Sequence, residues 1–375
     1  KLFEIWLERA KEGQICHATV TVCQLPNLMA SDFAGIADMD FAIPYALDVL
    51  KLKMGERARI ASGPKQKGLT ADYVCYNLGS SPKSFDFLIW LIDAEMTRVR
   101  EGAPSPLKVV FTKGQDGKSG ISNTAEQQMF VNVMRPLVKM IGVEDDSAIG
   151  GRSSEWFVLR NVTLASRKGE KVPKLKPSVE ATETVKRYLE GSSPITITLR
   201  ELNSWEHRNS NMEAWLKFSD YLEKQGERVI FIRDTAKAGE PILGKMTFPL
   251  ASLNIDIRLA LYEQAKCNLF VPSGPWNLGL FGSRPWLMFN RIGEDAPYIG
   301  NRIKFWEESQ GIKEGEQFPW SNKDQRIIWE KDDYETILNA WESLNDNSRT
   351  ADNEDRASTA STSGCNSTEF SPQPS

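Results

Sequence analysis

Four short apolar segments in the second half of the chain carry the clearest pattern. They are continuously apolar or β-branched rather than alternating, as expected for parallel strands buried on both faces. Helical periodicity fills the intervals between them. The segments are Ile195–Leu199, Val229–Ile232, Asn268–Val271 and Trp286–Phe289. This alternation predicts an α/β fold with an open parallel sheet.

Capping signals mark several of the helices in this half. The run Ser210-Asn-Met-Glu213 has the spacing of a capping box, in which the serine accepts from the amide three residues on. Gly226 stands where a helix would end in the left-handed conformation. Helices are therefore predicted from Ser178 to Glu190, from Ser210 to Gly226, from Asp256 to Lys266 and from Asp332 to Leu344.

The first half also alternates between strand-like and helix-like segments, which suggests a second α/β unit. Within it, Phe85, Leu88, Ile89, Ile92 and Met96 follow the spacing of one buried helix face. Strands are predicted over residues 15–23, 36–43, 73–76 and 107–111, and helices over residues 2–12, 44–54, 85–100 and 124–141.

A charged segment with two prolines, from Ser166 to Ser178, separates the halves and predicts a linker or surface loop. The chain of 375 residues is longer than the roughly 250–300 residues at which one core usually stops growing. We therefore expect an N-terminal domain over residues 1–175 and a C-terminal domain over residues 176–345. Residues 346–375 are predicted to be a disordered tail, because they contain almost nothing to bury.

Charge and cysteine content narrow the class of protein. The net charge of −4 argues against a general nucleic-acid binder. Five cysteines without CxxC spacing and two histidines argue against a zinc site and favour a reducing compartment. No apolar run approaches the roughly 20 residues of a membrane span. We expect a cytoplasmic protein, with peripheral membrane association left open, and with glycosylation sequons at Asn161 and Asn366 keeping secretion as the alternative.

A polar stretch begins directly after the first apolar segment, with Arg200. An arginine placed there can grip a diphosphate through two parallel hydrogen bonds. Glu206, His207 and Asn209 follow within a few residues and supply candidate acid–base and ligand-binding groups. The alternative is a solvated loop, in which Arg200 forms a surface ion pair and His207 is merely exposed.

A second polar turn, Ser273-Gly-Pro-Trp-Asn277, follows the third apolar segment. Free amides at the start of a helix attract phosphate, and Ser273 adds a hydroxyl. Gly274 would let the backbone approach a ligand closely, and Asn277 is a candidate contact to sugar or phosphate. The alternative is an ordinary strand-to-helix turn, for which Pro275 suits the first helical position.

Two aspartates are weaker candidates. Asp234 follows the second apolar segment, where it can bind a ribose or base, although an Asx turn is the slightly favoured interpretation. Asp86 lies in the polar turn Asn77–Asp86 of the first half, which would face a site between two domains. It is a candidate general base, but the simpler interpretation is an acid in the first turn of a helix.

Several familiar motifs are not matched. The run from Thr112 to Ser119 ends in Gly-Lys-Ser, but a P-loop requires glycine where Thr112 stands and a helix directly after the serine. No GxGxxG follows a predicted strand, and neither HExxH nor a serine elbow is present.

The features of residues 190–290 resemble glycosyltransferases of the GT-B type, which have two Rossmann-like domains facing across a cleft, and more closely their fucosyltransferase-like branch. Arg200 in Ile-Thr-Leu-Arg occupies the place of the family's diphosphate-binding arginine. The run Phe270–Asn277 looks like the family's strand, loop and helix that bind phosphates or sugar, and Val229–Asp234 is similar to its intervening strand. The family's His-x-Arg-Arg is not present, because Thr198 and Glu201 stand at two of its places. That departure leaves the donor sugar open.

The resemblance implies a hexosyl- or fucosyl-type glycosyltransferase that moves a sugar from a nucleotide-sugar donor to a glycan or other acceptor. Arg200, Asn209, Asp234, Ser273, Gly274 and Asn277 would bind the donor, while Arg200, Glu206, His207 and Asp86 are the catalytic candidates. No cofactor is expected, and metal is expected to be dispensable because a cation and helix amides can neutralise the diphosphate. A nucleotide-sugar epimerase and a non-catalytic nucleotide- or glycan-binding module are the alternatives.

Overall fold

The computed structural model describes residues 73–78, 81–102, 108–112, 126, 129–140, 159–202, 206–290 and 303–346. The elements expected before residue 73 and the tail expected beyond residue 346 lie outside this part of the chain. No helix among the described residues is both long enough and apolar enough to cross a membrane.

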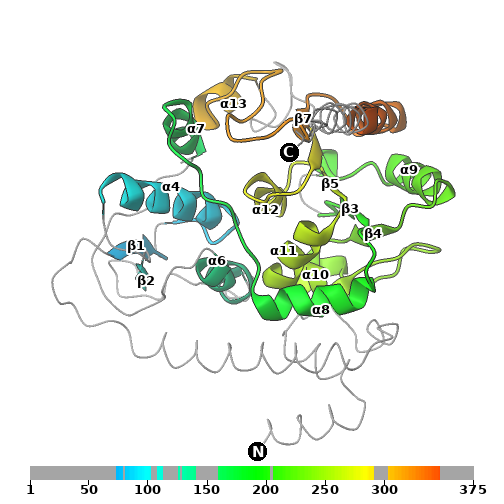
Figure 1. Ribbon diagram of the computed structural model, residues 1–375, viewed down its shortest axis with the longest axis horizontal. Helices are drawn as coiled ribbons and strands as arrows, with labels where there is room; N and C mark the ends of the chain where they lie inside the picture. Colours follow the sequence, from blue (N-terminus) through cyan, green and yellow to red (C-terminus); the bar gives the residue numbers. More distant parts are fainter. Residues whose placement is uncertain are drawn as a thin grey trace, which may run out of the picture.

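The elements follow the predicted alternation in both halves (Figure 1). The strands are β1 (Tyr73–Asn77), β2 (Lys108–Thr112), β3 (Ile195–Thr198), β4 (Val229–Ile232), β5 (Cys267–Phe270), β6 (Trp286–Phe289) and β7 (Gln325–Ile328). The helices are α4 (Asp86–Arg100), the π-helical turn η2 (Phe130–Met134), α6 (Arg135–Met140), α7 (Leu159–Arg167), α8 (Val179–Leu189), the 3-10 turns η3 (Glu206–Arg208) and η4 (Thr235–Lys237), α9 (Met212–Lys224), α10 (Pro249–Leu253), α11 (Ile255–Gln264), α12 (Trp276–Leu280), α13 (Ile303–Ser309) and a last helix over residues 334–346.

The four apolar segments form neighbouring parallel strands of one sheet, as predicted. The strand order is β4-β3-β5-β6-β7, and every pairing is parallel. Along the chain, β4 is added on one side of β3 and β5 on the other. This is the 2-1-3-4-5 order of a doubly wound sheet, whose direction of winding reverses between β3 and β5.

The fifth strand, β7, was not predicted, because its pattern is short and polar. Its residues alternate between buried and half-buried positions, as at a sheet edge. The carboxamide of Gln317 covers that edge: Ile327 N donates to its Oε1 at 2.6 Å, and its Nε2 donates to Ile327 O at 3.0 Å. A side chain thus satisfies edge groups that would otherwise invite another strand.

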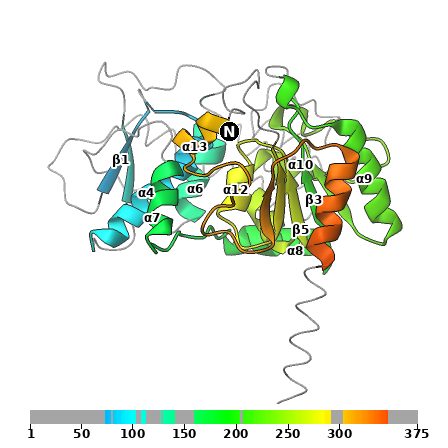
Figure 2. The same cartoon turned by 90° about the horizontal axis from the view of Figure 1, so that it is seen from above.

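Helices cover both faces of the five-stranded sheet (Figure 2). On one face, α9 and the helix over residues 334–346 bury a core that includes Trp215, Phe218 and Trp341. On the other face, α8, α10, α11 and α12 pack against alternate strand residues such as Ile230 and Phe270. Burial on both faces explains why these strands read as unbroken apolar runs.

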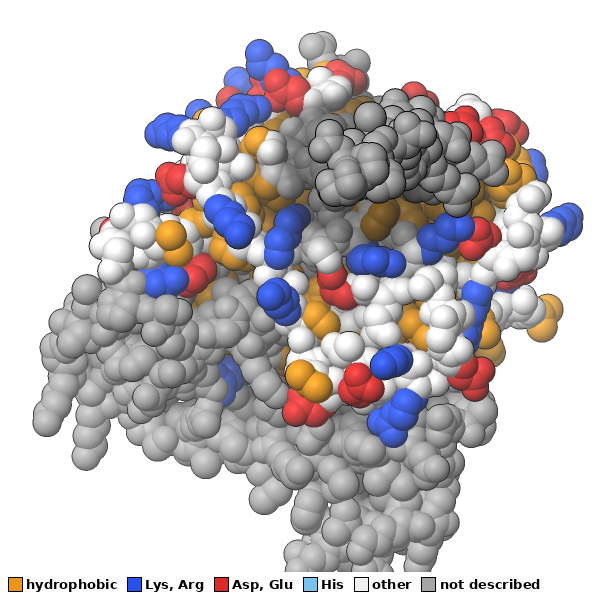
Figure 3. All heavy atoms as spheres, viewed as in Figure 1, with side chains coloured by type: hydrophobic (Ala, Val, Ile, Leu, Met, Phe, Trp, Pro, Cys, Tyr) orange, Lys and Arg blue, Asp and Glu red, His pale blue; other side chains and the backbone are white. Residues whose placement is uncertain are grey.

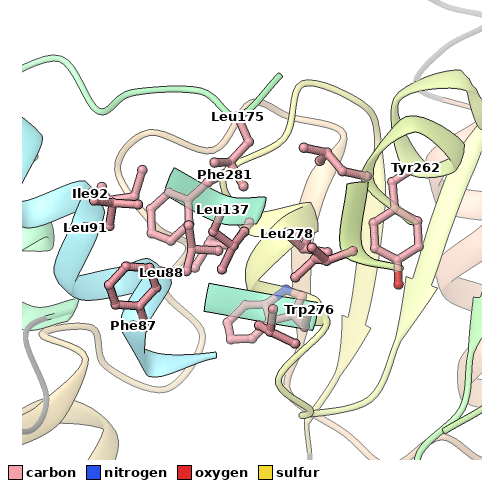
Figure 4. Close-up of a cluster of buried hydrophobic side chains, with 14 of the residues drawn as sticks. Phe87, Leu88, Leu91, Ile92, Leu137, Leu175, Tyr262, Trp276, Leu278 and Phe281 are labelled. Carbon is pink, nitrogen blue, oxygen red and sulfur yellow. The ribbon is translucent and has the colours of Figure 1, made fainter. Parts of the chain in front are cut away.

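The first half packs on the helices of this second face. β1 and β2 form a parallel pair, and α4 supplies Phe87, Leu88, Leu91 and Ile92 to the core. Figure 4 shows these side chains beside Leu137 of α6, with Phe281, Leu278 and Trp276 from the other half. Among the described residues, one continuous apolar cluster therefore joins the two halves. The domain boundary at residues 175 and 176 stays a prediction.

The predicted linker is not a free surface loop. Val172 and Leu175 are buried, and Leu175 N donates to Phe281 O at 2.8 Å. The ammonium of Lys174 donates to Gly282 O at 2.9 Å, and burial lowers its pKa. The segment leaves α7 and is bonded along the end of α12 before α8 begins at its N-cap, Ser178. Val172 and Leu175 gave no apolar pattern in the sequence, because charged residues surround them.

The predicted capping box of α9 is wrong by one residue. Asn211 is the N-cap, and its Oδ1 accepts from Ala214 N at 3.3 Å. The Ser210 hydroxyl is engaged elsewhere, by Arg200 N at 2.9 Å. At the other end, Gly226 follows the last turn with a φ of 82°, as the helix-stop signal predicted.

Candidate functional site

The candidate site lies where the sheet reverses its direction of winding, at the carboxyl ends of β3 and β5. These strands pair directly, with Thr198 opposite Phe270. The chain therefore leaves both strands at the same edge, with Arg200 on one side and the Ser273 turn on the other. Ligands of open α/β sheets bind in the crevice beyond such a switch point. The structure thus brings together the two polar turns that the sequence indicated.

Arg200 is a buried side chain held in place by its own loop. Its Nη1 donates to Asn209 Oδ1 at 2.6 Å, and its backbone N donates to the Ser210 hydroxyl. The Asn209 carboxamide also accepts from Leu202 N at 3.1 Å and donates to Leu202 O at 2.8 Å. Asn209, expected to contact the ligand, is thus already engaged by the protein and positions Arg200. Arg200 is buried, so it does not have the solvent-exposed position that the alternative of a surface ion pair required.

A buried ion pair lies beside Arg200. Arg233, which follows β4, donates from Nε and Nη2 to the two carboxylate oxygens of Glu201 at 2.9 and 2.5 Å. This bidentate contact raises the pKa of Arg233. Lys237 approaches the same carboxylate at 3.8 Å. The pair clamps the ends of β3 and β4 together and fixes the backbone from which Arg200 projects.

Asp234 bridges the same two strand ends. Its Oδ2 accepts a hydrogen bond from Glu201 N, and its side chain caps no turn. The favoured Asx turn is therefore not formed. Burial raises the pKa of Asp234, while the bond from Glu201 N and the positive charges of Arg258 and Arg200 act in the opposite direction. Its carboxylate thus lies within the electrostatic reach of two buried arginines.

One of those arginines, Arg258, was not predicted. It lies on α11, and the preceding helix α10 is bonded to the turn after β4, because Thr235 Oγ1 donates to Ser252 O at 3.1 Å. Its Nε donates to Ala251 O at 2.6 Å and anchors the buried side chain. Among the described residues, its terminal nitrogens have no hydrogen-bond or ion-pair partner. A charged residue within a helix gives no signal in the sequence that it will lie at a strand end.

The Ser273 turn offers fewer free amides than the sequence predicted. The amides of Trp276, Asn277 and Leu278 already donate to carbonyls of the same turn, at 3.1 to 3.2 Å. The start of α12 therefore does not offer the expected row of free amides. Among the described residues, the amides of Ser273 and Gly274 have no backbone partner, and the buried Ser273 hydroxyl also lacks one.

Gly274 is required by packing within the protein. A Cβ atom at this position would lie 2.5 Å from Cδ2 of Phe85, whereas we expected glycine to admit a ligand. Phe85 immediately precedes α4, so this contact sets the first half against the turn after β5. Asp86, the first residue of α4, is exposed next to that contact and accepts from the Ser84 hydroxyl at 2.8 Å. Asp86 is thus both an acid in the first helical turn and a neighbour of the candidate site.

The other sequence candidates lie around the same edge. Glu206 and His207 form the exposed turn η3 of the Arg200 loop. Arg208 ties this loop to the neighbouring one, because its Nη2 donates to Pro272 O at 3.3 Å. Asn277 is buried on α12.

A further residue at this edge, Asn290, was missed. It follows β6 directly, and its backbone N donates to Ile328 O at 2.8 Å. The residue is 1% exposed, and among the described residues neither its Oδ1 nor its Nδ2 has a hydrogen-bond partner. The signal that identified Arg200 and Ser273, a polar residue after an apolar strand, also applies to Asn290.

The described residues contain no group of three or more His, Cys, Asp or Glu side chains placed to hold a metal ion. On the face drawn in Figure 3, Lys and Arg side chains stand apart among polar and acidic ones and form no continuous basic patch. The three arginines described above, Arg200, Arg233 and Arg258, are all buried.

Comparisons with known proteins give distant structural likenesses only. No family model matches the chain, and no curated protein matches it. A family 9 glycosyl transferase from Veillonella parvula is 10% identical, with a TM-score of 0.39 over 74% of this chain and 98% of that one. The ADP-heptose LPS heptosyltransferase II of E. coli is 10% identical, with a TM-score of 0.42 over 72% and 98%.

A third solved structure is the iron-containing dodecameric glycosyltransferase TibC from enterotoxigenic E. coli. It is 12% identical, with a TM-score of 0.40 over 75% of this chain and 78% of that one. TM-scores of this size do not by themselves establish a shared fold. A function for this chain therefore has to be argued from its own site.

Proposed function

We propose that this chain is a glycosyltransferase that uses a nucleotide-sugar donor. The observation that carries the proposal is the placement of the buried Arg200 and the Ser273 turn on adjacent strand ends at the switch point of the sheet. Doubly wound sheets bind nucleotides at this position. Arg258 adds a second buried guanidinium near Asp234. Two guanidinium groups suit a diphosphate, which carries negative charge on several oxygens.

The charged network suits the departure of a nucleoside diphosphate. When the bond between the sugar carbon and the diphosphate oxygen breaks, negative charge grows on that oxygen. Arg200, already oriented by Asn209 and Ser210, would stabilise this charge without reorganising. The acceptor hydroxyl would attack the sugar carbon and lose its proton to a base. Asp86 is the candidate base, because the contact between Phe85 and Gly274 holds its helix beside the turn.

Donor binding tests the proposal first. Purified protein is screened by thermal shift against ADP, GDP, UDP and one hexose derivative of each, because a ligand that binds only the native state raises the melting temperature. The Arg200→Ala variant is expected to bind the responding diphosphate about 10- to 100-fold more weakly, since a hydrogen bond to a charged group contributes roughly 1.5–3 kcal/mol. Binding of the unphosphorylated nucleoside should not change.

Arg284→Ala is the matched control. Arg284 is half-buried and, like Arg258, donates from Nε to a backbone carbonyl, that of Ala265 at 2.8 Å, but it precedes β6 at the opposite edge. This variant should bind the diphosphate as the wild type does. A folded Arg200→Ala protein with unchanged diphosphate affinity would reject the assigned role. In turnover assays, acceptor-dependent release of diphosphate favours a transferase, whereas an isomerised donor favours an epimerase.

A further inference from the structure

The buried polar groups at the carboxyl edge of β5 and β6 differ from the charged groups of the site. Ser273 follows β5, and Asn290 follows β6. These strands are paired with Phe270 opposite Met288, so continuing the register places Pro272 opposite Asn290. Adjacent strands lie about 5 Å apart, so the Ser273 turn and Asn290 are neighbours at one edge of the sheet.

The direction of the Asn290 side chain follows from strand alternation. Trp286 and Met288 belong to the core beneath α11 and α12, whereas Leu287 and Phe289 belong to the core beneath α9. Asn290 N still donates to β7, so the extended backbone continues and Asn290 lies on the Trp286 and Met288 face. Thr198 lies on this same face, bonded to Tyr262 of α11 at 2.7 Å, two residues before Arg200. The carboxamide is thus on the side of the sheet that faces the first half.

Asn290 differs from the other buried asparagine of these strands. Asn268, inside β5, accepts from Thr196 Oγ1 at 2.6 Å and donates to Tyr262 O at 3.1 Å. The polar atoms of the Asn290 carboxamide and the Ser273 hydroxyl are also buried, but they have no hydrogen-bond partner among the described residues. A buried polar group without a hydrogen bond reduces stability and needs a reason.

We infer that Asn290, with Ser273, forms a subsite for hydroxyl groups of a sugar ring, beside the diphosphate held by Arg200. This inference rests on the proposed function. A carboxamide offers both a donor and an acceptor, and a serine hydroxyl can act as either, which matches a neutral hydroxyl better than a phosphate. The ring is the transferred sugar or the ribose of the nucleotide. Sites built to bind a hydroxyl reject analogues that lack it, so Asn290 would contribute to specificity.

Asn290→Leu tests this inference, because it removes the polar group and keeps the shape of the side chain. The unliganded variant is expected to melt at the same temperature as the wild type or higher, since no hydrogen bond is lost. Its affinity for the nucleotide sugar identified by the screen should fall about tenfold or more. Asn290→Ala should show the same loss of affinity and guards against overpacking by leucine. The matched control, Asn268→Leu, breaks two internal hydrogen bonds, so it should melt lower and bind the donor unchanged.

Titrations with the free nucleoside diphosphate identify the ring. An affinity lost only for the nucleotide sugar assigns Asn290 to the transferred sugar, and an affinity lost for both ligands assigns it to the ribose. Unchanged binding of both by Asn290→Leu and Asn290→Ala overturns the inference while the proposed function stands. A wild-type protein that binds neither ligand overturns both.

Discussion

The ends of β3 and β4 carry charged side chains that are fixed by one another, whereas the ends of β5 and β6 carry neutral side chains without partners. On the first side, Arg233 clamps Glu201 through two hydrogen bonds, and Asp234 accepts from Glu201 N. On the second side, the Ser273 hydroxyl and the Asn290 carboxamide make no hydrogen bond within the part of the chain that the structure describes. One edge of one sheet thus contains two kinds of polar environment.

The difference follows from the cost of burying each kind of group. An unpaired buried charge costs far more than an unpaired amide or hydroxyl, for which protein data give roughly 1–3 kcal/mol. The protein therefore pairs most of its buried charges internally. The pair of Arg233 and Glu201 fixes the backbone that carries Arg200 before any ligand binds. The neutral groups can remain available for a ligand at a modest loss of stability. In the proposed function, the charged groups form the diphosphate site and the neutral groups recognise hydroxyl groups of the donor.

The largest expected effect comes from breaking the charged side. Glu201→Leu leaves Arg233 without its bidentate partner and should lower the free energy of unfolding by about 3 kcal/mol, at the low end of the range for buried pairs because Arg233 also donates to Glu240 O. Urea denaturation measures the change. Replacing both partners by apolar residues should recover most of it. The exposed pair of Arg167 and Glu316 is the control, since Arg167→Gln should cost at most about 1 kcal/mol. Equal losses for the two single variants would contradict the comparison.

A smaller effect is expected from packing on the neutral side. Gly274→Ala adds a methyl group that meets the Phe85 ring, and overpacking of this kind costs about 1–3 kcal/mol. The hydrogen-bonding groups of Ser273 and Asn290 are unchanged, so the variant separates packing from recognition. In a Phe85→Leu background the same substitution should cost less, which a double-mutant cycle measures. An identical cost in both backgrounds would show that Phe85 is not the neighbour that matters.

The smallest effect concerns the pH dependence of stability. Burial raises the pKa of Asp234 in the folded protein above its usual value near 3.9. The protonated form therefore stabilises the folded state below that usual value, and this contribution is lost as the pH rises through the folded pKa. As the pH rises from the usual aspartate pKa through the folded pKa, the free energy of unfolding of the wild type should therefore fall relative to that of Asp234→Asn. Denaturation curves from pH 3.5 to 7 test the sign, and a wild type that gains stability relative to the variant would contradict it.

Much of the fold, and the position of some candidate-site residues at strand ends, could be predicted from the sequence. The four buried strands were correctly located because burial on both faces leaves a continuous apolar run, and Arg200 and Ser273 follow directly from where such runs end. Strand β7 escaped because an edge strand is only half-buried. Arg258 and the role of Ser210 could not be predicted, because each depends on a partner from another element. The fucosyltransferase-like branch, the donor and the individual residue roles stay predictions.

The sequence by itself determined which segments become strands and helices and which polar residues stand at strand ends, because periodicity and capping are local properties of the chain. Only the tertiary structure decided which strand ends are neighbours, that Gly274 meets Phe85, and that Asn290 is buried without a partner while Asn268 is satisfied. These outcomes depend on pairing and packing between residues far apart in the chain. A local pattern records what a residue can do, and the surrounding fold determines whether its hydrogen bonds are used within the protein or left for a ligand.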